Sequence, residues 1–145
     1  MDSSIRFANA EDSAGICRLV NGSLGYPDVT EADLRERLER MQVDGRYFTL
    51  VAECGAEMVG FLSVQQGIAI EITGDYFRVI ALAVDTAHRR EGIGGALLAR
   101  MEAIAGARGV QYFTLSSGMQ RAGAHTFYER MGYVKKSFAF SKGIK

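Results

Sequence analysis

The feature that most constrains this chain is a glycine-rich turn between an apolar segment and an amphipathic one. Residues 79–84 are apolar on both alternate faces, which is typical of a central β-strand covered on both sides. Residues 93–105 carry apolar side chains at helical spacing. Between them lies Arg-Arg-Glu-Gly-Ile-Gly-Gly, at 89–95. A strand, a tight glycine turn and a helix in this order predict an α/β domain with an anion-binding turn.

Such a turn can hold an anion because of the helix that follows it. The first N–H groups of a helix lack intrahelical partners, and the helix dipole places partial positive charge there. Glycines let the backbone approach a phosphate without an intervening Cβ. A P-loop is excluded because no Lys-Ser or Lys-Thr follows, and a dinucleotide fingerprint is excluded because Leu97 takes the place of its third glycine. For the short pattern alone, a helix start without a ligand remains the alternative.

The rest of the chain alternates between strand and helix periodicities. Two-residue periodicity predicts strands at 4–10, 47–53, 58–65, 68–73, 76–84, 110–117 and 133–143. Helical spacing predicts helices through 16–20 after a cap at Asn9 or Asp12, over 31–41 after a cap at Thr30, over 93–105, and over 122–132. A chain of 145 residues suits one domain and is too short for two. We therefore predict a single α/β domain covering residues 1–145.

Charge and cysteine content exclude several classes of protein. The 17 Lys and Arg residues balance 17 Asp and Glu residues, so no long-range positive field would gather nucleic acid or anionic lipid. No apolar run approaches the roughly 18 residues of a membrane span, and the chain start lacks a signal-peptide pattern. Cys17 and Cys54 favour two buried thiols over a disulfide or a zinc site. The sequence predicts a cytoplasmic protein that binds neither nucleic acid nor a membrane.

Two motifs resemble those of the GNAT superfamily of N-acetyltransferases. The first, Arg/Gln-x-x-Gly-x-Gly/Ala, is the family's pyrophosphate turn and is matched by Arg89, Gly92 and Gly94. The second, Asn-x-x-Ala-x-x-Phe-Tyr-x-x-x-Gly-Phe/Tyr, is matched over 124–133, but Arg121 stands in place of its Asn. The motifs occur in the family's order, one helix and one strand apart. The resemblance covers roughly the last two-thirds of the chain.

The resemblance implies a GNAT-type α/β (α+β) fold. Its central sheet is mixed but mostly antiparallel, with six or seven strands that splay apart between the fourth and the fifth, and about four helices flank it. GNAT-like domains often dimerise through sheet edges or helices, and nothing in this sequence specifies a homodimer.

The resemblance also implies acetyl-CoA as the co-substrate and no metal. The pyrophosphate would lie on the backbone of residues 90–95, and the pantetheine would pair with the edge of a strand. Whether Arg121 replaces the family Asn is open, and Arg89 and Arg90 have the alternative of being solvated beside Asp85. The predicted cofactor-binding residues are Leu82, Ala83, Val84, Arg89, Arg90, Glu91, Gly92, Ile93, Gly94, Gly95 and Arg121.

Tyr128 matches the family's general acid, which protonates the departing thiolate after an amine attacks the thioester. Its alternative is a purely structural place in the core. No base is identified. Glu71 and Asp75 are the nearest carboxylates in the sequence, Asp75 has the alternative of being a turn residue after Gly74, and a water held by Ser116 or by a backbone carbonyl is an equal candidate. His88 and His125 are expected to be structural.

The predicted activity is acetyl transfer to a primary amine, either a small molecule or a peptide. Residues 22–37 and 67–75 and the C-terminal strands are expected to select the acceptor. Within the enzymes, a longer acyl donor or an alcohol acceptor is the competing possibility. A regulatory module that binds acyl-CoA without turnover is the alternative from another class, since the motif Asn and an obvious base are missing.

Overall fold

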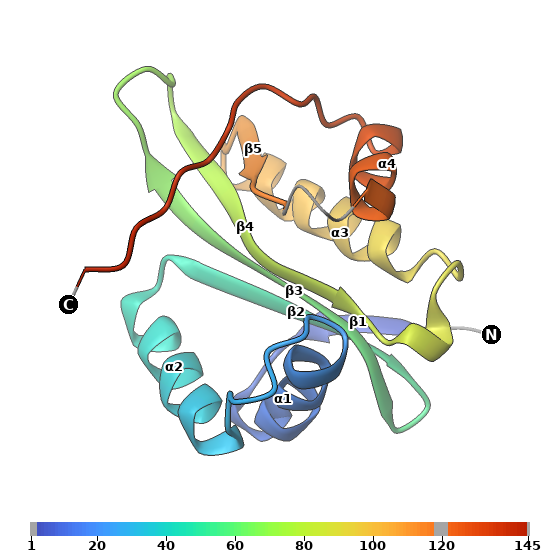
Figure 1. Cartoon of the computed structure of the whole chain (residues 1–145). Helices are drawn as coiled ribbons and strands as arrows, with labels where there is room; N and C mark the ends of the chain where they lie inside the picture. The colour runs from blue at the N-terminus through green and yellow to red at the C-terminus, as the bar shows by residue number, and fades with distance from the viewer. Residues whose placement is uncertain (1–2, 118–121, 145) are drawn as a thin grey trace. The chain divides into compact units, whose positions relative to one another are not determined.

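The computed structural model describes residues 3–117 and 122–144 (Figure 1). Its chain divides into two compact units, one ending at Thr114 and one beginning at Leu115. The elements in chain order are β1 (Ser4–Phe7), η1 (Ala10–Asp12), α1 (Ser13–Gly22), α2 (Glu31–Asp44), β2 (Tyr47–Cys54), β3 (Glu57–Ile68), β4 (Asp75–Val84), η2 (Thr86–His88), α3 (Ile93–Ala107), β5 (Tyr112–Leu115) and α4 (Ala122–Arg130), where η marks a 3-10 helix.

One sheet with the strand order β1-β2-β3-β4-β5 organises the first unit. Strands β1 to β4 pair antiparallel with their neighbours, and the β2–β3 hairpin turns at Gly55, where φ is 63°. The connection from β4 to β5 passes through α3, a crossover of the kind that links parallel neighbours. The fold is therefore of the mixed α+β type that the sequence predicts.

The described residues form five strands, so the prediction of six or seven is wrong. Residues 69–74 form a loop after β3, and 133–144 contain no strand. Both segments alternate apolar and polar residues, yet Ile70, Phe138 and Phe140 are exposed. Alternation gives a segment one apolar face, but a strand also needs a partner, and neither segment pairs with one among the described residues.

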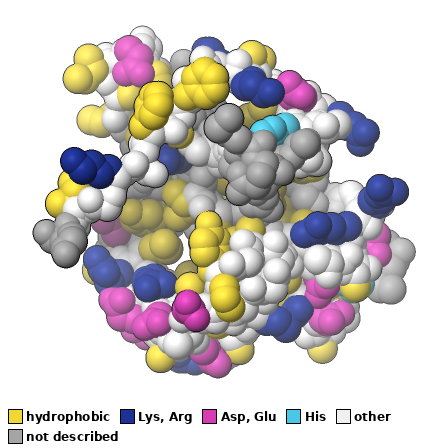
Figure 2. Space-filling model, viewed as in Figure 1, with side chains coloured by type: hydrophobic (Ala, Val, Ile, Leu, Met, Phe, Trp, Pro, Cys, Tyr) yellow, Lys and Arg dark blue, Asp and Glu magenta, His cyan; other side chains and the backbone are white. Residues whose placement is uncertain are grey.

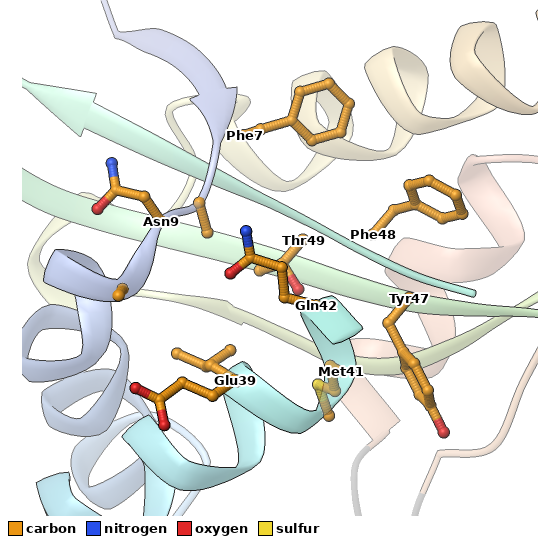
Figure 3. Close-up of a pocket in the computed structure, with 11 residues that line it drawn as sticks. Phe7, Asn9, Glu39, Met41, Gln42, Tyr47, Phe48 and Thr49 are labelled. Carbon is orange, nitrogen blue, oxygen red and sulfur yellow. The ribbon is translucent and has the colours of Figure 1, made fainter. Parts of the chain in front are cut away.

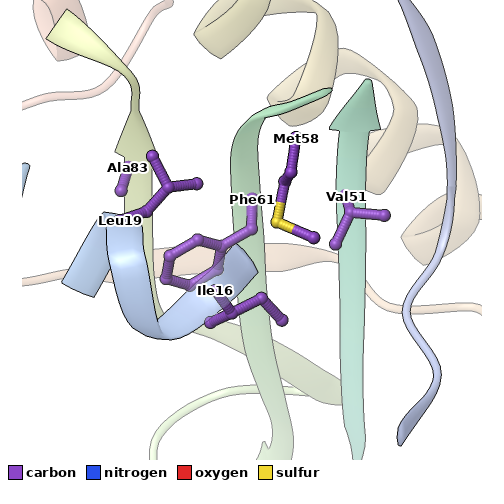
Figure 4. Packing of buried hydrophobic residues seen from close by; sticks show 6 residues of the cluster. All are labelled: Ile16, Leu19, Val51, Met58, Phe61 and Ala83. Carbon is purple, nitrogen blue, oxygen red and sulfur yellow. The ribbon is translucent and has the colours of Figure 1, made fainter. Parts of the chain in front are cut away.

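The two faces of the sheet are covered by different helices (Figure 1). Helices α1 and α2 lie on one face, and α3 lies on the other and contacts β2, β3 and β4. On the first face a cluster of buried side chains joins α1 to three strands (Figure 4); its members are Ile16, Leu19, Val51, Met58, Phe61 and Ala83. On the second face α3 buries Ile93, Leu97, Leu98, Met101 and Ala105, which are the positions that the helical spacing predicts apart from Ile104.

Helix α2 is a surface helix, as its dense charge predicts. Thr30 caps it by accepting from the Asp33 N–H at 3.0 Å, and the Asp33 carboxylate accepts from the Thr30 N–H in return. This reciprocal pair satisfies two N–H groups at the helix start. No residue of α2 is buried, but Leu34 and Leu38 contact the core cluster. The cap predicted at Thr30 is therefore confirmed.

The sequence predicts that the strand at 79–84 is covered on both sides. This prediction is only partly correct, because Ile80 in β4 is 39% exposed. Cys17 is buried and Cys54 is half-buried, and neither forms a disulfide. In the part of the chain that the structure describes, no helix is long and apolar enough to cross a membrane. On the face shown in Figure 2, basic and acidic side chains are interspersed.

Candidate active site

The turn after β4 is anchored through both the backbone and the side chain of Asp85. The Asp85 N–H donates to the Val59 carbonyl at 2.8 Å, which continues the sheet into the turn. Its carboxylate accepts from the Ala87 N–H at 3.0 Å and from Arg18 Nη1 at 2.9 Å. These bonds, led by the one from Ala87, hold the pKa of Asp85 below its ordinary value. Asp85 is therefore paired with Arg18 of α1, while Arg89 and Arg90 are exposed.

Beyond Asp85 the backbone adopts two left-handed conformations within three residues. Arg90 has φ 67° and Gly92 has φ 81°. Glycine adopts this region freely, but for Arg90 it costs roughly 1–2 kcal/mol. Backbone strain of this kind is typical of functional turns, where the surrounding structure holds it in place. Nothing in the sequence predicts the strain at Arg90, because arginine rarely adopts a positive φ.

Helix α3 begins at Ile93 without a side-chain cap. Gly92 is its N-cap residue and offers no side chain to accept from the first N–H groups. Such groups lack intrahelical acceptors and carry the positive end of the helix dipole. Of the predicted residues, Glu91 and Gly92 thus form the turn, and Ile93, Gly94 and Gly95 form the uncapped first turn of α3. This arrangement can bind a phosphate or pyrophosphate through its backbone.

Gly60, which the sequence analysis did not single out, positions that helix start. It lies in β3 opposite Val84, the last residue of β4. A Cβ added at Gly60 would stand 3.1 Å from the Ala83 carbonyl oxygen and 3.1 Å from Ile93 Cγ2. The glycine therefore lets the first turn of α3 lie close against the sheet. A lone glycine inside a strand pattern is the signal that could have identified this close approach.

Leu82, Ala83 and Val84 lie together at the C-terminal end of β4, directly before the turn. Ser63 pairs with Ala81 and Val64 with Val79, so Ile80 is the extra residue of a β-bulge. On the side of β4 away from β3, β5 starts beside Asp75, whose carbonyl accepts from the Gln111 N–H at 3.3 Å. Since β5 has four residues and β4 has ten, β5 cannot follow β4 to its end. Among the described strands none pairs with the rest of this edge, and a strand edge of this kind can pair with an extended ligand.

Tyr128 lies on α4 in the second unit, in the last turn of the helix, which ends at Arg130. Gly132 has φ 94°, its N–H donates to the Glu129 carbonyl at 3.1 Å, and the Tyr133 N–H donates to the Tyr128 carbonyl at 3.0 Å. These two bonds define a Schellman C-cap, in which the residue after the glycine usually contacts the helix residue five positions earlier. The Tyr133 ring packs edge-on against Tyr128 with centroids 6.0 Å apart.

This C-cap gives a physical reason for the spacing Tyr-x-x-x-Gly-Tyr. The glycine supplies the left-handed residue, and the final aromatic ring fixes the Tyr128 side chain from one side. Phe127 adds a second edge-on contact to Tyr128 at 5.3 Å. The motif therefore orients one phenol. Arg121, the remaining predicted site residue, lies outside the described residues.

The candidate bases differ in their surroundings. Asp75 accepts from Gln66 Nε2 at 2.8 Å and stands at the start of β4, whereas Glu71 is exposed in the preceding loop. Ser116 follows β5 and lies in no helix or strand. His88 contacts Glu57 and Glu91, and His125 lies on α4. No His/Cys/Asp/Glu cluster among residues 3–117 and 122–144 could hold a metal ion.

A hollow of about 140 Å³ lies near the β1 edge of the sheet, between α2 and the strands β1 and β2 (Figure 3). Its lining comprises Phe7, Ala8, Asn9, Ala10, Leu38, Glu39, Met41, Gln42, Tyr47, Phe48 and Thr49. Glu39 is the only carboxylate in this lining. The hollow is not part of the predicted site, because β3 separates β2 from β4 in the sheet.

The chain is similar to known acetyltransferases over most of its length. It is 28% identical over 144 residues to aminoalkylphosphonate N-acetyltransferase of Salmonella typhimurium, covering 97% of this chain and 90% of that protein. A GNAT family acetyltransferase from Staphylococcus aureus matches with a TM-score of 0.82 at 27% identity, covering 99% and 100% of the two chains. AAC(6')-Iy, solved with the bisubstrate analog CoA-S-monomethyl-acetylneamine, matches with a TM-score of 0.85 at 11% identity, covering 100% and 99%.

The family model for the acetyltransferase (GNAT) domain matches residues 45–135, which include β4, the turn, α3 and α4. The match covers more than half of the chain and contains both sequence motifs. Members of this family use acetyl-CoA. The chain belongs to the GNAT acetyltransferase family and is an acyltransferase.

Proposed function

We propose that this protein transfers an acetyl group from acetyl-CoA to a primary amine. The observation that carries the proposal is the turn from Arg90 to Gly92, which has two left-handed residues and leads into the uncapped start of α3. Such a turn suits a pyrophosphate, because several N–H groups converge where the helix dipole is positive. The proposal takes residues 1–145 as one catalytic domain.

The chain's own residues fit acetyl-CoA. A Cβ at Gly92 would meet nothing within 4 Å, so the turn is open on that side. Arg89 and Arg90 are exposed beside it and add positive charge toward phosphate oxygens. The edge of residues 82–84 would accept and donate the amide hydrogen bonds of the pantetheine, as an added strand does. Arg121, outside the described residues, is proposed as one more phosphate contact.

In the proposed reaction the amine nitrogen attacks the thioester carbonyl carbon and forms the new C–N bond. The C–S bond then breaks, and the thiolate takes the proton of the Tyr128 hydroxyl. The attacking ammonium must first lose a proton, which costs about 4–5 kcal/mol at neutral pH for a pKa near 10.4. That first proton leaves to water, and no side chain is proposed as the base. After attack the nitrogen still carries one proton too many; this second proton leaves through solvent and is returned to the Tyr128 oxygen, which restores the phenol. The products are an acetamide and free CoA.

The proposed acceptor is a small primary amine. The Salmonella relative, which matches 97% of this chain, is named for acetylating aminoalkylphosphonates, so these amines are the first acceptors to test. Aminoglycoside-type amines are the second class, because the structural relative AAC(6')-Iy was solved with an acetylneamine analog.

Steady-state turnover tests the proposal. Purified protein is mixed with acetyl-CoA and one of 2-aminoethylphosphonate, neamine or a peptide with a free N-terminus, and free thiol is measured over time. We expect thiol release that depends on the amine, with the acetylated amine identified by mass spectrometry. The control replaces each amine by its N-acetylated form. Acetyl-CoA binding without release for any amine would instead support the regulatory module.

A further inference from the structure

His88 lies between two carboxylates next to the anion-binding turn. Its Nδ1 is 3.2 Å from Glu91 Oε1, and its Nε2 is 3.4 Å from Glu57 Oε1. The imidazole side chain is 15% exposed, whereas the side chains of Glu57 and Glu91 are 59% and 40% exposed. A neutral imidazole donates from one nitrogen only, and an imidazolium donates from both. The geometry therefore favours the charged form.

The three residues connect separate parts of the fold. His88 ends η2, Glu91 stands between the two left-handed residues Arg90 and Gly92, and Glu57 begins β3. Through His88 the turn is thus fastened to the β2–β3 hairpin. Without this contact the Glu91 side chain would be a free negative charge within a turn that suits an anion.

We infer that His88 is a positioning residue for acetyl-CoA, fixing the Arg90–Gly92 turn and offsetting the negative charge of Glu57 and Glu91. The inference rests on the proposed function, because it assigns the pyrophosphate to this turn. His88 contacts neither the thioester nor the amine in this scheme. Its effect is on the affinity for CoA and not on the chemical step.

The charged groups around His88 set the direction of the pH dependence. Glu91 first, and then Glu57, raise the pKa of His88 above its ordinary 6.5. Asp85 also faces His88, but its carboxylate is paired with Arg18. As the pH rises through the pKa of His88, the positive charge disappears and both carboxylates are left uncompensated. CoA should therefore bind more tightly below this pKa than above it.

The test is the Kd for CoA, measured by calorimetry between pH 5.5 and 8.5 for the wild type and His88→Gln. Glutamine keeps a polar side chain but cannot take up a proton. Because an exposed ion pair has a small effect, we expect the variant to bind CoA only about two- to fivefold more weakly at pH 5.5. The ratio of the Kd of His88→Gln to the Kd of the wild type should approach one above the pKa of His88. The titration of the CoA phosphates cancels in this ratio, because both proteins bind the same ligand.

Two further variants sharpen the result. In Glu91→Gln the partner of His88 is gone, so adding His88→Gln should change the Kd little, and the double-mutant cycle measures their coupling. Proton NMR follows the imidazoles directly, because the chain has 2 histidines and His88→Gln identifies the His88 signal. Glu57→Gln should lower the pH at the midpoint of the His88 titration.

The outcomes separate this inference from the proposed function. A Kd ratio that stays constant with pH, while both proteins bind CoA, would overturn the role of His88 and leave the proposed function standing. A wild type that fails to bind CoA at every pH would overturn both. A ratio that falls toward one as the pH rises, with coupling to Glu91, supports the inference.

Discussion

Tyr128→Phe is expected to lower kcat for amine acetylation by about 100-fold or more, with the Kd for acetyl-CoA nearly unchanged. The substitution removes the hydroxyl proton but keeps the ring. The Schellman C-cap at Gly132 consists of backbone hydrogen bonds, and the contact with Tyr133 is made by the aromatic rings. Because Tyr128→Phe keeps both, α4 should end in the same way in the variant. Stopped-flow or steady-state thiol release with the best amine gives kcat, and calorimetry gives the Kd.

Tyr133→Phe is the matched control for this experiment. It removes a phenol hydroxyl from the same pair of rings while leaving the proposed acid in place. Its kcat should stay within severalfold of the wild type. If Tyr128→Phe turns over as fast as the wild type, or if both variants lose the same activity, Tyr128 is not the general acid.

Gly92→Ala is expected to weaken acetyl-CoA binding about tenfold. Gly92 has φ 81°, a conformation that costs an L-residue roughly 1–2 kcal/mol. With alanine the free turn relaxes out of this conformation, and CoA binding must restore it at that cost, which corresponds to about a tenfold lower affinity. The added Cβ meets no atom within 4 Å, so the effect comes from backbone conformation and not from a clash. Titration calorimetry with acetyl-CoA measures it directly.

Gly106→Ala provides the control, because Gly106 lies in the same helix with ordinary helical geometry and open space around it. Alanine there should stabilise the protein by about 0.5–1 kcal/mol and leave the Kd unchanged. Equal affinity of Gly92→Ala and the wild type would contradict the assignment of the pyrophosphate to this turn.

Local patterns predicted the parts of the site that depend on neighbouring residues. The glycines of 89–95 and the apolar spacing of 93–105 predicted the turn and the buried face of α3. Thr30 and Asp33 predicted the start of α2 for the same reason, since a capping box is complete within four residues.

Features that join distant residues could not be predicted in this way. A glycine inside a strand pattern signals that something approaches Gly60 closely, but the pattern does not reveal that its neighbours are Ile93 and the Ala83 carbonyl. The pairing of Asp85 with Arg18 and of His88 with Glu57 joins residues far apart in the sequence. The alternation at 133–143 predicted a strand, but alternation says nothing about whether a neighbouring strand is present.

Thermal unfolding with and without acetyl-CoA tests the central claim most directly. A ligand at about 100 times its Kd stabilises the folded state by about 2.7 kcal/mol, which raises Tm by roughly 5–10 °C for a domain of this size. We predict this rise with acetyl-CoA, a smaller one for Gly92→Ala at the same concentration, and none with NADH or ATP. An unchanged Tm with acetyl-CoA, or an equal rise with all three ligands, would contradict the claim that residues 89–95 bind the pyrophosphate of CoA.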